Sequence, residues 1–297
     1  MNQQDHTQWT ILNILQWTTN YFQEKGVQSP RLTAEILLAH TLQKDRMYLY
    51  VHHDQPLEAA ERSHFKILIK QRVQGTPTQY LTGKQEFWSM EFQVTPEVLI
   101  PRPETEHLVE AAIKLSAQFP QPTIVDIGTG SGVIAVSLKK ELPHAEVYAS
   151  DISEAALAIA KRNASQLLNG ENHIIFRQGD LLQPFSGTTF DLIVSNPPYC
   201  SAEEYSTLAR EVKNHEPRIT LYAGEHGLDV YHRLIAEAHS YLKPDGYVLV
   251  EIGYGQKDAV VGIFQRHGFV IKDVIKDYAG IDRVVVARWH GNYKDFA

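Results

Sequence analysis

Cysteine is almost missing from this sequence, which has one among 297 residues, Cys200. A single cysteine excludes an intramolecular disulfide and is typical of a protein that works in a reducing compartment. No charge-free apolar run approaches the roughly 18 residues that cross a membrane. The first residues, Met1 to His6, lack a basic stretch followed by an apolar core, so we expect no signal peptide. These absences predict a cytoplasmic protein with no membrane contact.

Positive charge is scarce in most of the chain. Residues 86–297 contain 19 Lys and Arg against 28 Asp and Glu, whereas residues 1–85 contain nine against seven, which together give the formal net charge of −7. Binding to DNA or RNA is dominated by contacts between basic residues and phosphates. The excess of acidic residues therefore disfavours a nucleic-acid substrate without excluding one.

Clusters of metal ligands are missing as well. Although the chain has 14 histidines, no second group of ligands with metal-site spacing accompanies the pair His52 and His53. We therefore expect this pair at the surface and predict no metal site. No nucleophile is paired with His107, His215 or His226, which we expect to be structural or solvent-facing.

Residues 1–85 have the apolar spacing of helices, with apolar side chains recurring every three or four positions in several segments. Ser29 and Pro30 are typical of a helix start, with serine as the N-cap and proline in the first position. A further helix is predicted over 57–73, ending before Gly75. We predict a small helical bundle domain over residues 1–85, with little catalytic chemistry in it.

Two short segments separate this bundle from the rest of the chain. Residues 86–100 alternate between apolar and polar side chains and predict a β-hairpin or linker. In residues 99–106 two prolines fix an extended path, and Glu104 and Glu106 favour the start of a following helix. This second segment is either a plain linker or a wall of a binding site with Arg102 at its edge.

From Thr123 onward, predicted strands alternate with predicted helices, which is the pattern of a parallel sheet covered by helices. We therefore predict an α/β domain over residues 101–297. Its last two strands, 269–274 and 282–287, are predicted to form an antiparallel pair. The other predicted strands are 123–127, 146–151, 173–177, 192–194 and 246–252.

A glycine-rich turn follows the first predicted strand of this domain. Glycines at 128, 130 and 132 permit a tight strand-to-helix turn and close approach of the backbone to a ligand. Asp151, 19 residues after Gly132, has the spacing expected of a carboxylate that binds both ribose hydroxyls of a nucleoside. A third acidic residue, Asp180, stands near the end of the third strand. Together these residues indicate an adenosine-containing cofactor.

The residue that leads into the turn separates two classes of cofactor. NAD-binding sites have the spacing G-x-G-x-x-G, whereas this chain has D-x-G-x-G-x-G, led by Asp126. An acidic residue at the strand end would repel a pyrophosphate but suits the ammonium group of a methionine moiety. The spacing therefore favours S-adenosylmethionine over NAD.

The strand over 192–194 ends in a stiff corner, Asn196-Pro197-Pro198-Tyr199. The prolines donate no backbone N–H and fix φ near −65°, and Asn196 before a proline is biased towards an extended conformation. Free carbonyl oxygens, the Asn196 side chain and the Tyr199 ring suit a planar group with two N–H donors. A proline-rich turn is the alternative that these four residues alone leave open. In a doubly wound sheet, the corner and the glycine turn are expected to share one cleft.

Further motifs accompany the glycine turn and the corner. They are Tyr80-Leu-Thr-Gly83, Leu99-Ile-Pro-Arg-Pro-Glu-Thr-Glu106, Glu216-Pro-Arg218, Gly224 with Gly227-Leu228, and Gly280-Ile-Asp-Arg283. Together they resemble the HemK/PrmC family, over nearly the whole chain and least over residues 1–75. The resemblance implies a seven-stranded, Rossmann-like, S-adenosylmethionine-dependent methyltransferase domain preceded by the helical bundle. It also implies methylation of a glutamine side-chain amide in the Gly-Gly-Gln loop of peptide chain release factors.

The same resemblance assigns roles to individual parts of the chain. The helical bundle is expected to bind the release factor, and we expect the enzyme to be a monomer. Some relatives have an aromatic residue at position 181 that packs on adenine, and leucine there would pack less specifically. Substrate binding is expected at Arg102 and at the catalytic corner, Asn196, Pro197, Pro198 and Tyr199. Cofactor contacts are expected at Gly128, Thr129, Gly130, Ser131, Gly132, Asp151, Asp180, Leu181 and Asn196.

Other interpretations remain open. A DNA adenine or rRNA guanine amino methyltransferase would hold an exocyclic amine in the same corner, but it needs a base-flipping pocket and a basic surface. A non-catalytic cofactor-binding adaptor conflicts with the intact corner. Arg218 is part of a surface turn or braces the Tyr199 loop, and Glu251 is a core carboxylate or a wall of the site. Cys200 is expected to be a small buried side chain.

Overall fold

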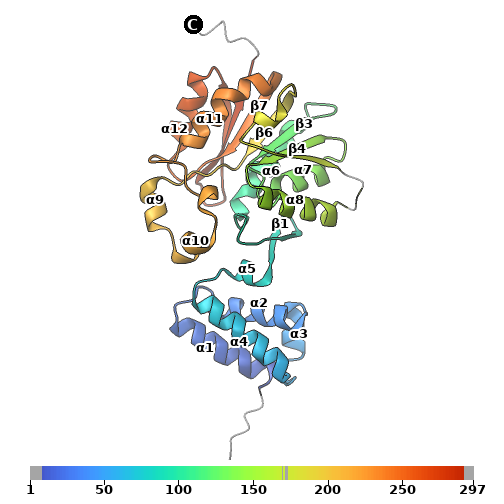
Figure 1. Ribbon diagram of the computed structural model, residues 1–297, viewed down its shortest axis with the longest axis vertical. Helices are drawn as coiled ribbons and strands as arrows, with labels where there is room; N and C mark the ends of the chain where they lie inside the picture. Colours follow the sequence, from blue (N-terminus) through green and yellow to red (C-terminus); the bar gives the residue numbers. More distant parts are fainter. Residues whose placement is uncertain (1–8, 169, 171–172, 291–297) are drawn as a thin grey trace, which may run out of the picture. The chain divides into compact units, whose positions relative to one another are not determined.

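The computed structural model describes residues 9–168, 170 and 173–290, which fall into two compact units (Figure 1). The first unit ends at Gly83 and includes the distant segment Arg210–His215. The second unit comprises Lys84–Ala209 and the chain from Glu216 onward. The contact units thus divide at Gly83, and the domain boundaries near residues 85 and 100 stay predictions. The N-terminal residues for which we expect no signal peptide lie outside the described residues.

The first unit is a bundle of helices around one apolar core, as the spacing of apolar residues predicts. Thr10 and Asp45 begin two of these helices by accepting hydrogen bonds from the backbone N–H groups of Asn13 and Tyr48, at 3.2 and 2.8 Å. The helices are α1 (Ile11–Glu24), α2 (Pro30–Leu42), α3 (Arg46–Val51), α4 (Ala59–Val73), α5 (Thr78–Thr82) and α10 (Arg210–His215). The core includes the buried side chains of Ile11, Phe22, Leu37, Leu49 and Phe65.

The predicted cap at Ser29 is wrong in one respect. Pro30 does open α2, but Ser29 has a left-handed backbone, with φ 45°, and its side chain makes no capping hydrogen bond. An extended backbone is what brings a serine hydroxyl close to the first N–H groups of a helix, and a left-handed one does not. Thr33 supports this turn instead, because its hydroxyl donates to the Gln28 carbonyl oxygen at 3.1 Å.

Helix α10 joins the first unit from a distant part of the sequence. Arg72 on α4 is 8% exposed and forms an ion pair with Glu211 on α10 at 2.6 Å. The same guanidinium donates to the Thr76 carbonyl oxygen at 3.3 Å. The sequence did not predict this association, because it joins segments 139 residues apart.

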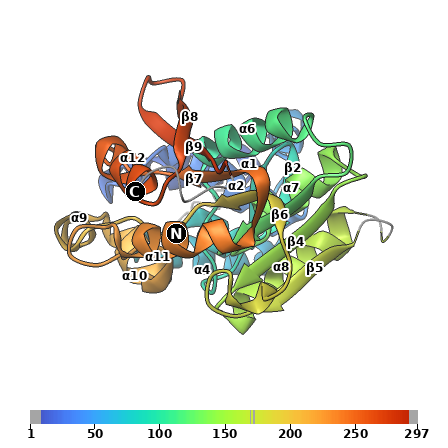
Figure 2. The same cartoon turned by 90° about the horizontal axis from the view of Figure 1, so that it is seen from above.

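The second unit contains a seven-stranded sheet in the order β5-β4-β3-β6-β7-β9-β8, with β5 and β8 at opposite edges (Figure 2). Strands β3 to β7 pair in parallel, and β9 runs antiparallel to both of its neighbours, β7 and β8. This confirms the predicted α/β fold and the antiparallel closing pair. Strand order reverses between β3 and β6, as expected. The strands are β3 (Thr123–Ile127), β4 (Glu146–Asp151), β5 (Ile174–Gln178), β6 (Phe190–Ser195), β7 (Leu242–Glu251), β8 (Val270–Lys276) and β9 (Asp282–Arg288).

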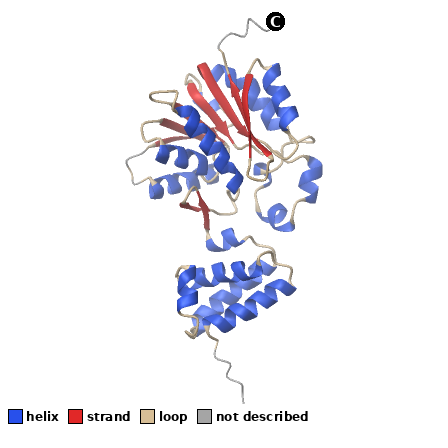
Figure 3. Cartoon of the chain, turned by 180° about the vertical axis from the view of Figure 1, so that it is seen from behind, coloured by secondary structure: helices blue, strands red, loops and turns tan. Residues whose placement is uncertain are grey.

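The two faces of the sheet bury separate apolar layers. Along β6, Leu192 and Val194 belong to one layer and Ile193 to the other, as the alternation of a strand requires. Because helices cover both faces (Figure 3), the carboxyl edge of the strands is where a ligand can reach the parallel sheet. One layer contains α6 (Glu106–Ser116), α7 (Val133–Glu141) and α8 (Glu154–Leu167), and the other contains α11 (Asp229–Ala238) and α12 (Lys257–Arg266).

A small hairpin precedes the sheet. Its strands β1 (Lys84–Phe87) and β2 (Met90–Gln93) pair antiparallel. Trp88 and Ser89 between them both have positive φ, 51° and 54°, as a tight two-residue turn requires. Asn163 on α8 connects the hairpin to the second unit's helices. Its side chain accepts a hydrogen bond from the Gln93 N–H at 2.8 Å and donates one to the Gln93 carbonyl oxygen at 3.0 Å. The hairpin thus covers residues 84–93, and it begins two residues before the segment 86–100 for which a hairpin or linker was predicted.

The remaining elements are short. Helix α11 ends at Ala238, and β7 begins at Leu242, four residues before the start of the strand predicted over 246–252. No helix in the described parts of the chain is long and apolar enough to span a membrane. The short elements are α9 (Ala202–Thr207) and the 3-10 turns η1 (Pro103–Thr105), η2 (Gln183–Phe185), η3 (Arg218–Thr220) and η4 (His239–Tyr241).

Candidate active site

The glycine turn joins β3 to α7 at the carboxyl edge of the sheet. Gly128, Gly130 and Gly132 have positive φ, at 71°, 56° and 84°, a conformation that glycine adopts without strain. A Cβ atom at Gly132 would lie 3.1 Å from the Ala160 Cβ, so glycine there lets the turn pack closely against α8. A Cβ atom at Gly128 or Gly130 would meet no atom within 4 Å. The backbone of the turn is therefore open to a ligand.

Asp126, the residue before the last of β3, is completely buried. Its Oδ2 accepts hydrogen bonds from the Thr129 hydroxyl at 2.6 Å and from the Ala135 N–H at 3.2 Å. Its Oδ1 has no hydrogen-bond partner among the residues that the structure describes. Burial raises the pKa of this carboxyl to about 7, although the two hydrogen bonds lower it. An unpartnered carboxylate oxygen beside an open turn fits the ammonium group of S-adenosylmethionine.

Asp151 ends β4 and is tied to the same turn. Its Oδ2 accepts from the Gly130 N–H and its Oδ1 from the Ser153 N–H, both at 2.9 Å. Burial raises the pKa of Asp151, and these backbone hydrogen bonds lower it. Each carboxylate oxygen accepts more than one hydrogen bond. Asp151 is thus able to bind ribose hydroxyls while it holds the turn.

The segment after β5 lies beside the end of β4. Gly179 donates its N–H to the Asp151 carbonyl oxygen at 3.1 Å, and Asp180 forms an ion pair with Arg233. The partly buried Leu181 side chain packs against the apolar layer that contains α11 and α12. The carboxyl edge of β3, β4 and β5 therefore brings together the residues predicted to bind the cofactor other than Asn196, which follows β6. They are Gly128, Thr129, Gly130, Ser131, Gly132, Asp151, Asp180 and Leu181.

The corner 196–199 begins where β6 ends, next to the glycine turn. The Ser195 hydroxyl donates to the Ile127 carbonyl oxygen at 2.8 Å, which joins the ends of β6 and β3. Asn196 is half-buried, and its Nδ2 donates to the Thr105 Oγ1 at 3.1 Å. This contact uses the amide nitrogen and leaves the side-chain oxygen of Asn196 for another partner.

Glu251 ends β7 and is 1% exposed. Burial raises the pKa of its carboxyl to about 7, while side-chain hydrogen bonds with Thr105 and Asn196 lower it. Its Oε2 has no hydrogen-bond partner within the described residues. Glu251 is thus both a buried carboxylate and a neighbour of the corner, so the two interpretations of it are compatible.

A glutamine that the sequence did not reveal holds the second half of the corner. Gln256 donates through Nε2 to the Tyr199 carbonyl oxygen at 2.8 Å and accepts through Oε1 from the Gly253 N–H at 2.9 Å. A Cβ atom at Gly227 would collide with the Tyr199 carbonyl oxygen, and one at Gly253 would lie 2.9 Å from the Tyr199 Cδ2. Burial raises the pKa of the Tyr199 phenol, which keeps it neutral. Gly227 and Gly253 were the only signal in the sequence for this close packing around Tyr199.

The loop that follows Tyr199 is braced by Arg218. The Cys200 N–H donates to the Leu221 carbonyl oxygen at 2.7 Å, and the Ala223 N–H donates to the Cys200 carbonyl oxygen at 3.0 Å. The Arg218 guanidinium lies over the ring of Tyr222, 4.6 Å from its centre. Cys200 is buried as expected, and burial raises the pKa of its thiol. Of the two interpretations of Arg218, the structure supports the brace.

Arg102 forms an ion pair with Glu216, the first residue of the motif 216–218. Its Nη2 donates to the Glu216 Oε1 at 2.6 Å, while the Ile100 N–H donates to the Glu216 Oε2 at 3.2 Å. The Arg102 side chain remains 33% exposed. Glu216 therefore holds the segment 99–106 in place, and the role of Arg102 in substrate binding stays a prediction.

Two family models match this chain. Residues 13–83 match the PrmC N-terminal domain, and residues 105–216 match the methyltransferase small domain. Among solved structures, a methyltransferase from Pyrococcus furiosus aligns with 68% of this chain and 90% of its own, at 17% sequence identity and a TM-score of 0.49.

Curated relatives cover nearly the whole chain. A release factor glutamine methyltransferase of Geobacter sulfurreducens is 44% identical over 94% of this chain and 97% of its own. A release factor glutamine methyltransferase of Koribacter versatilis is 45% identical over 94% of this chain and 98% of its own. The chain belongs to the release factor glutamine methyltransferase family. The resemblance drawn from the motifs is therefore confirmed.

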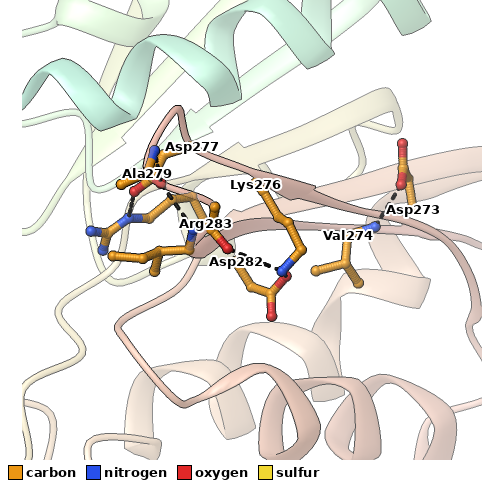
Figure 4. Close-up of polar contacts among 9 residues, drawn as sticks. Asp273, Val274, Lys276, Asp277, Ala279, Asp282 and Arg283 are labelled. Atoms are coloured by element: carbon orange, nitrogen blue, oxygen red, sulfur yellow. Dashed lines mark hydrogen bonds and ion pairs between the residues drawn. The ribbon is translucent and has the colours of Figure 1, made fainter.

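A motif on which the resemblance to this family rests, residues 280–283, covers the end of the turn between β8 and β9 and the first two residues of β9 (Figure 4). Arg283 donates through Nε to the Asp277 Oδ2 at 2.8 Å, and the Asp277 Oδ1 accepts from the Ala279 N–H at 2.9 Å. The positive charge of Arg283 lowers the pKa of both Glu251 and Tyr199. The turn thus contributes a fixed charge to the corner.

The histidines singled out in the sequence lie at or near the surface. His52, His53 and His226 are exposed, and His107 and His215 are partly buried. Across residues 9–168, 170 and 173–290, no group of three or more His, Cys, Asp and Glu residues is arranged to hold a metal ion.

Proposed function

We propose that this protein transfers a methyl group from S-adenosylmethionine to the side-chain amide nitrogen of the glutamine in the Gly-Gly-Gln loop of peptide chain release factors. One observation carries the proposal. The Ser195–Ile127 hydrogen bond holds Asn196, an acceptor for amide N–H groups, beside the open glycine turn. Curated release factor glutamine methyltransferases that match nearly the whole chain support it.

The corner addresses the main chemical difficulty of this reaction. A side-chain amide is a poor nucleophile, because its nitrogen lone pair is delocalised into the carbonyl group. The Asn196 side-chain oxygen and a backbone carbonyl oxygen of the corner each accept one N–H of the target amide. They localise electron density on nitrogen, orient it, and stabilise the positive charge that develops there. Gln256 holds the backbone carbonyl of Tyr199, and the Tyr199 ring covers the flat face of the amide.

S-adenosylmethionine supplies an activated methyl group on its sulfonium. The backbone of the glycine turn would hold this cofactor, with Asp126 binding its ammonium group and Asp151 its ribose hydroxyls. Asp180 and Leu181 would border the adenine. The target nitrogen gains the methyl group and releases one proton to water, so no strong general base is required in the transition state.

We assign recognition of the release factor to the first unit. A groove of about 430 Å³ is lined by residues of α1 and α4. On the α1 side, Trp17 is 48% exposed and stacks on Tyr21 with ring centres 5.2 Å apart. On the α4 side stand Arg62, Lys66 and Lys70. Aromatic surface beside three cations suits a segment of the release factor that carries both apolar and acidic side chains.

We further propose that the enzyme acts in the cytoplasm as a monomer. The one cysteine, buried in the second unit, fits a reducing compartment, in which release factors also work. A single chain carries the groove, the glycine turn and the corner, so the proposed reaction needs no second copy. Sedimentation of the purified protein checks the oligomeric state.

Transfer of a radiolabelled methyl group tests the substrate directly. The wild-type enzyme is given a release factor, the same factor with its loop glutamine replaced by alanine, duplex DNA, and rRNA, all at equal concentration. We expect label on the intact factor, located on the loop glutamine by mass spectrometry, and none on the other three. Preferential labelling of nucleic acid, with the loop glutamine unmodified, would contradict the proposal.

A further inference from the structure

The side-chain amide of Asn196 has two ends of similar size and opposite hydrogen-bonding character. The reaction needs its oxygen to face the target amide, because the nitrogen would present N–H groups to N–H groups. In the structure the Asn196 Nδ2 donates to the Thr105 Oγ1 at 3.1 Å. A hydroxyl both donates and accepts, so Thr105 alone would tolerate either end of the amide.

Glu251 removes this ambiguity. The register of the sheet places Glu251 beside Asn196, because Ser195 pairs with Val250, and the side chains of Thr105 and Asn196 lower the pKa of its carboxyl. An ionised carboxylate only accepts hydrogen bonds, so it takes either the hydroxyl proton of Thr105 or an N–H of Asn196. In both cases the nitrogen of Asn196 faces Glu251 and Thr105, and its oxygen faces the target.

We propose that Glu251, acting with Thr105, is a positioning residue that holds the Asn196 side-chain oxygen towards the amide of the target glutamine. This inference rests on the proposed function and adds two residues to it. Neither residue touches the substrate, since both act through Asn196.

The fold fixes both positioning residues. Glu251 pairs with Val284 of β9, and the Tyr231 hydroxyl of α11 donates to its backbone carbonyl oxygen at 2.7 Å. Thr105, at the start of α6, is 2% exposed. Glu251 itself is 1% exposed, and its Oε2 has no partner in the described parts of the chain. A buried carboxylate with an unpartnered oxygen disfavours folding, and this cost supports a role for Glu251 in the site.

The orientation of the Asn196 side-chain amide depends on pH, because only the ionised form of Glu251 is restricted to accepting hydrogen bonds. Burial raises its pKa to about 7; the hydrogen bond with Thr105 and the charge of Arg283 lower the pKa, whereas Glu104 raises it. Below about pH 7 the carboxyl becomes protonated, is able to donate, and no longer selects one end of the Asn196 amide. The titratable or charged groups that face Glu251 are Glu104, Tyr199, Tyr231 and Arg283 (Figure 4 shows Arg283).

The variant Glu251→Gln tests the inference, because glutamine both donates and accepts. We expect kcat to fall roughly 10- to 100-fold, as commonly happens when a group that orients an active-site side chain is lost, with cofactor affinity and the KM for release factor nearly unchanged. The wild-type kcat should rise with pH through about 7, and the variant should lose this rise. Glu146→Gln is the matched control: it removes another strand carboxylate that accepts a hydrogen bond, from Tyr148 at 2.8 Å, at the opposite end of β4.

A second pair of variants keeps the test valid if Glu251→Gln folds poorly. Thr105→Val removes the hydroxyl at nearly constant size and should lower kcat, whereas Thr105→Ser keeps the hydroxyl and most of the activity. Equal rates for the valine and serine variants, or a Glu251→Gln enzyme with wild-type kcat and pH profile, would overturn the inference. Labelling of the loop glutamine by the wild-type enzyme, measured in the same assay, shows separately whether the proposed function holds.

Discussion

Replacing Glu251 by glutamine is expected to stabilise the folded protein at alkaline pH while it lowers activity. The pKa of Glu251 is about 7 in the folded protein, against 4.5 for an unperturbed glutamate, chiefly because the side chain is buried. The folded state therefore binds more protons than the unfolded state between these two values. Its free energy of unfolding falls as pH rises from 4.5 to about 7.

The size of this effect follows from the shift. A difference of about 2.5 pKa units corresponds to about 3 kcal/mol of destabilisation above pH 7. Glutamine carries no charge at any of these pH values, so the variant avoids this cost. Because glutamine still buries a polar amide, we expect the free energy of unfolding of the variant at pH 8 to exceed that of wild type by about 1–3 kcal/mol.

Urea denaturation at pH 5 and pH 8 measures the difference. Hydrogen exchange of peptides from β6 and β7, followed by mass spectrometry, reads the stability of the sheet separately from that of the helical unit. We expect the free energy of unfolding of the variant to exceed that of wild type at pH 8 and to approach it at pH 5. The same pH dependence in both proteins, or a variant that is less stable at pH 8, would refute the reasoning about Glu251.

Three further predictions concern other parts of the chain. Asp151→Ala should weaken S-adenosylmethionine binding by about 1–3 kcal/mol, the usual range for hydrogen bonds to a charged group, and calorimetric titration that finds unchanged affinity would remove Asp151 from the cofactor site. Gly227→Ala should lower kcat, because its Cβ would displace the Tyr199 carbonyl oxygen; the control is Gly255→Ala, which also has a positive φ, 77°, but meets no atom within 4 Å. Equal effects of the two would mean that backbone strain alone matters. Lys66→Glu, in the groove of the first unit, should raise the KM for the intact release factor several-fold and leave cofactor affinity unchanged; an unaltered KM would assign that groove another role.

The sheet was largely predictable because its signals are local. Strand β3 coincides with the segment predicted over 123–127, and β4 with 146–151, since buried parallel strands are short apolar runs that end at glycine or acidic residues. The glycine turn and the corner follow from the geometry that glycine and proline impose on the backbone. The cap at Ser29 failed because residue type alone does not determine the backbone conformation of the capping residue.

The contacts that complete the site were not predictable from the chain alone. Thr105 meets Asn196 across 91 residues of sequence, and Gln256 meets Tyr199 across 57. A threonine or a glutamine has no local pattern that marks such a role, because the role exists only once the sheet brings the strand ends together. The association of Glu211 with Arg72 was missed for the same reason.

The rate of methyl transfer by an Asn196→Ala enzyme, compared with wild type under saturating release factor and S-adenosylmethionine, tests the central claim most directly. The two prolines still end β6 in the variant, so the fold should persist, and the glycine turn and Asp151 should retain the cofactor with only modestly reduced affinity. We predict that kcat falls roughly 10²-fold or more, as loss of one preorganised hydrogen-bonding group commonly causes. A variant that methylates the loop glutamine at the wild-type rate would contradict the account, because the amide would then be activated without Asn196.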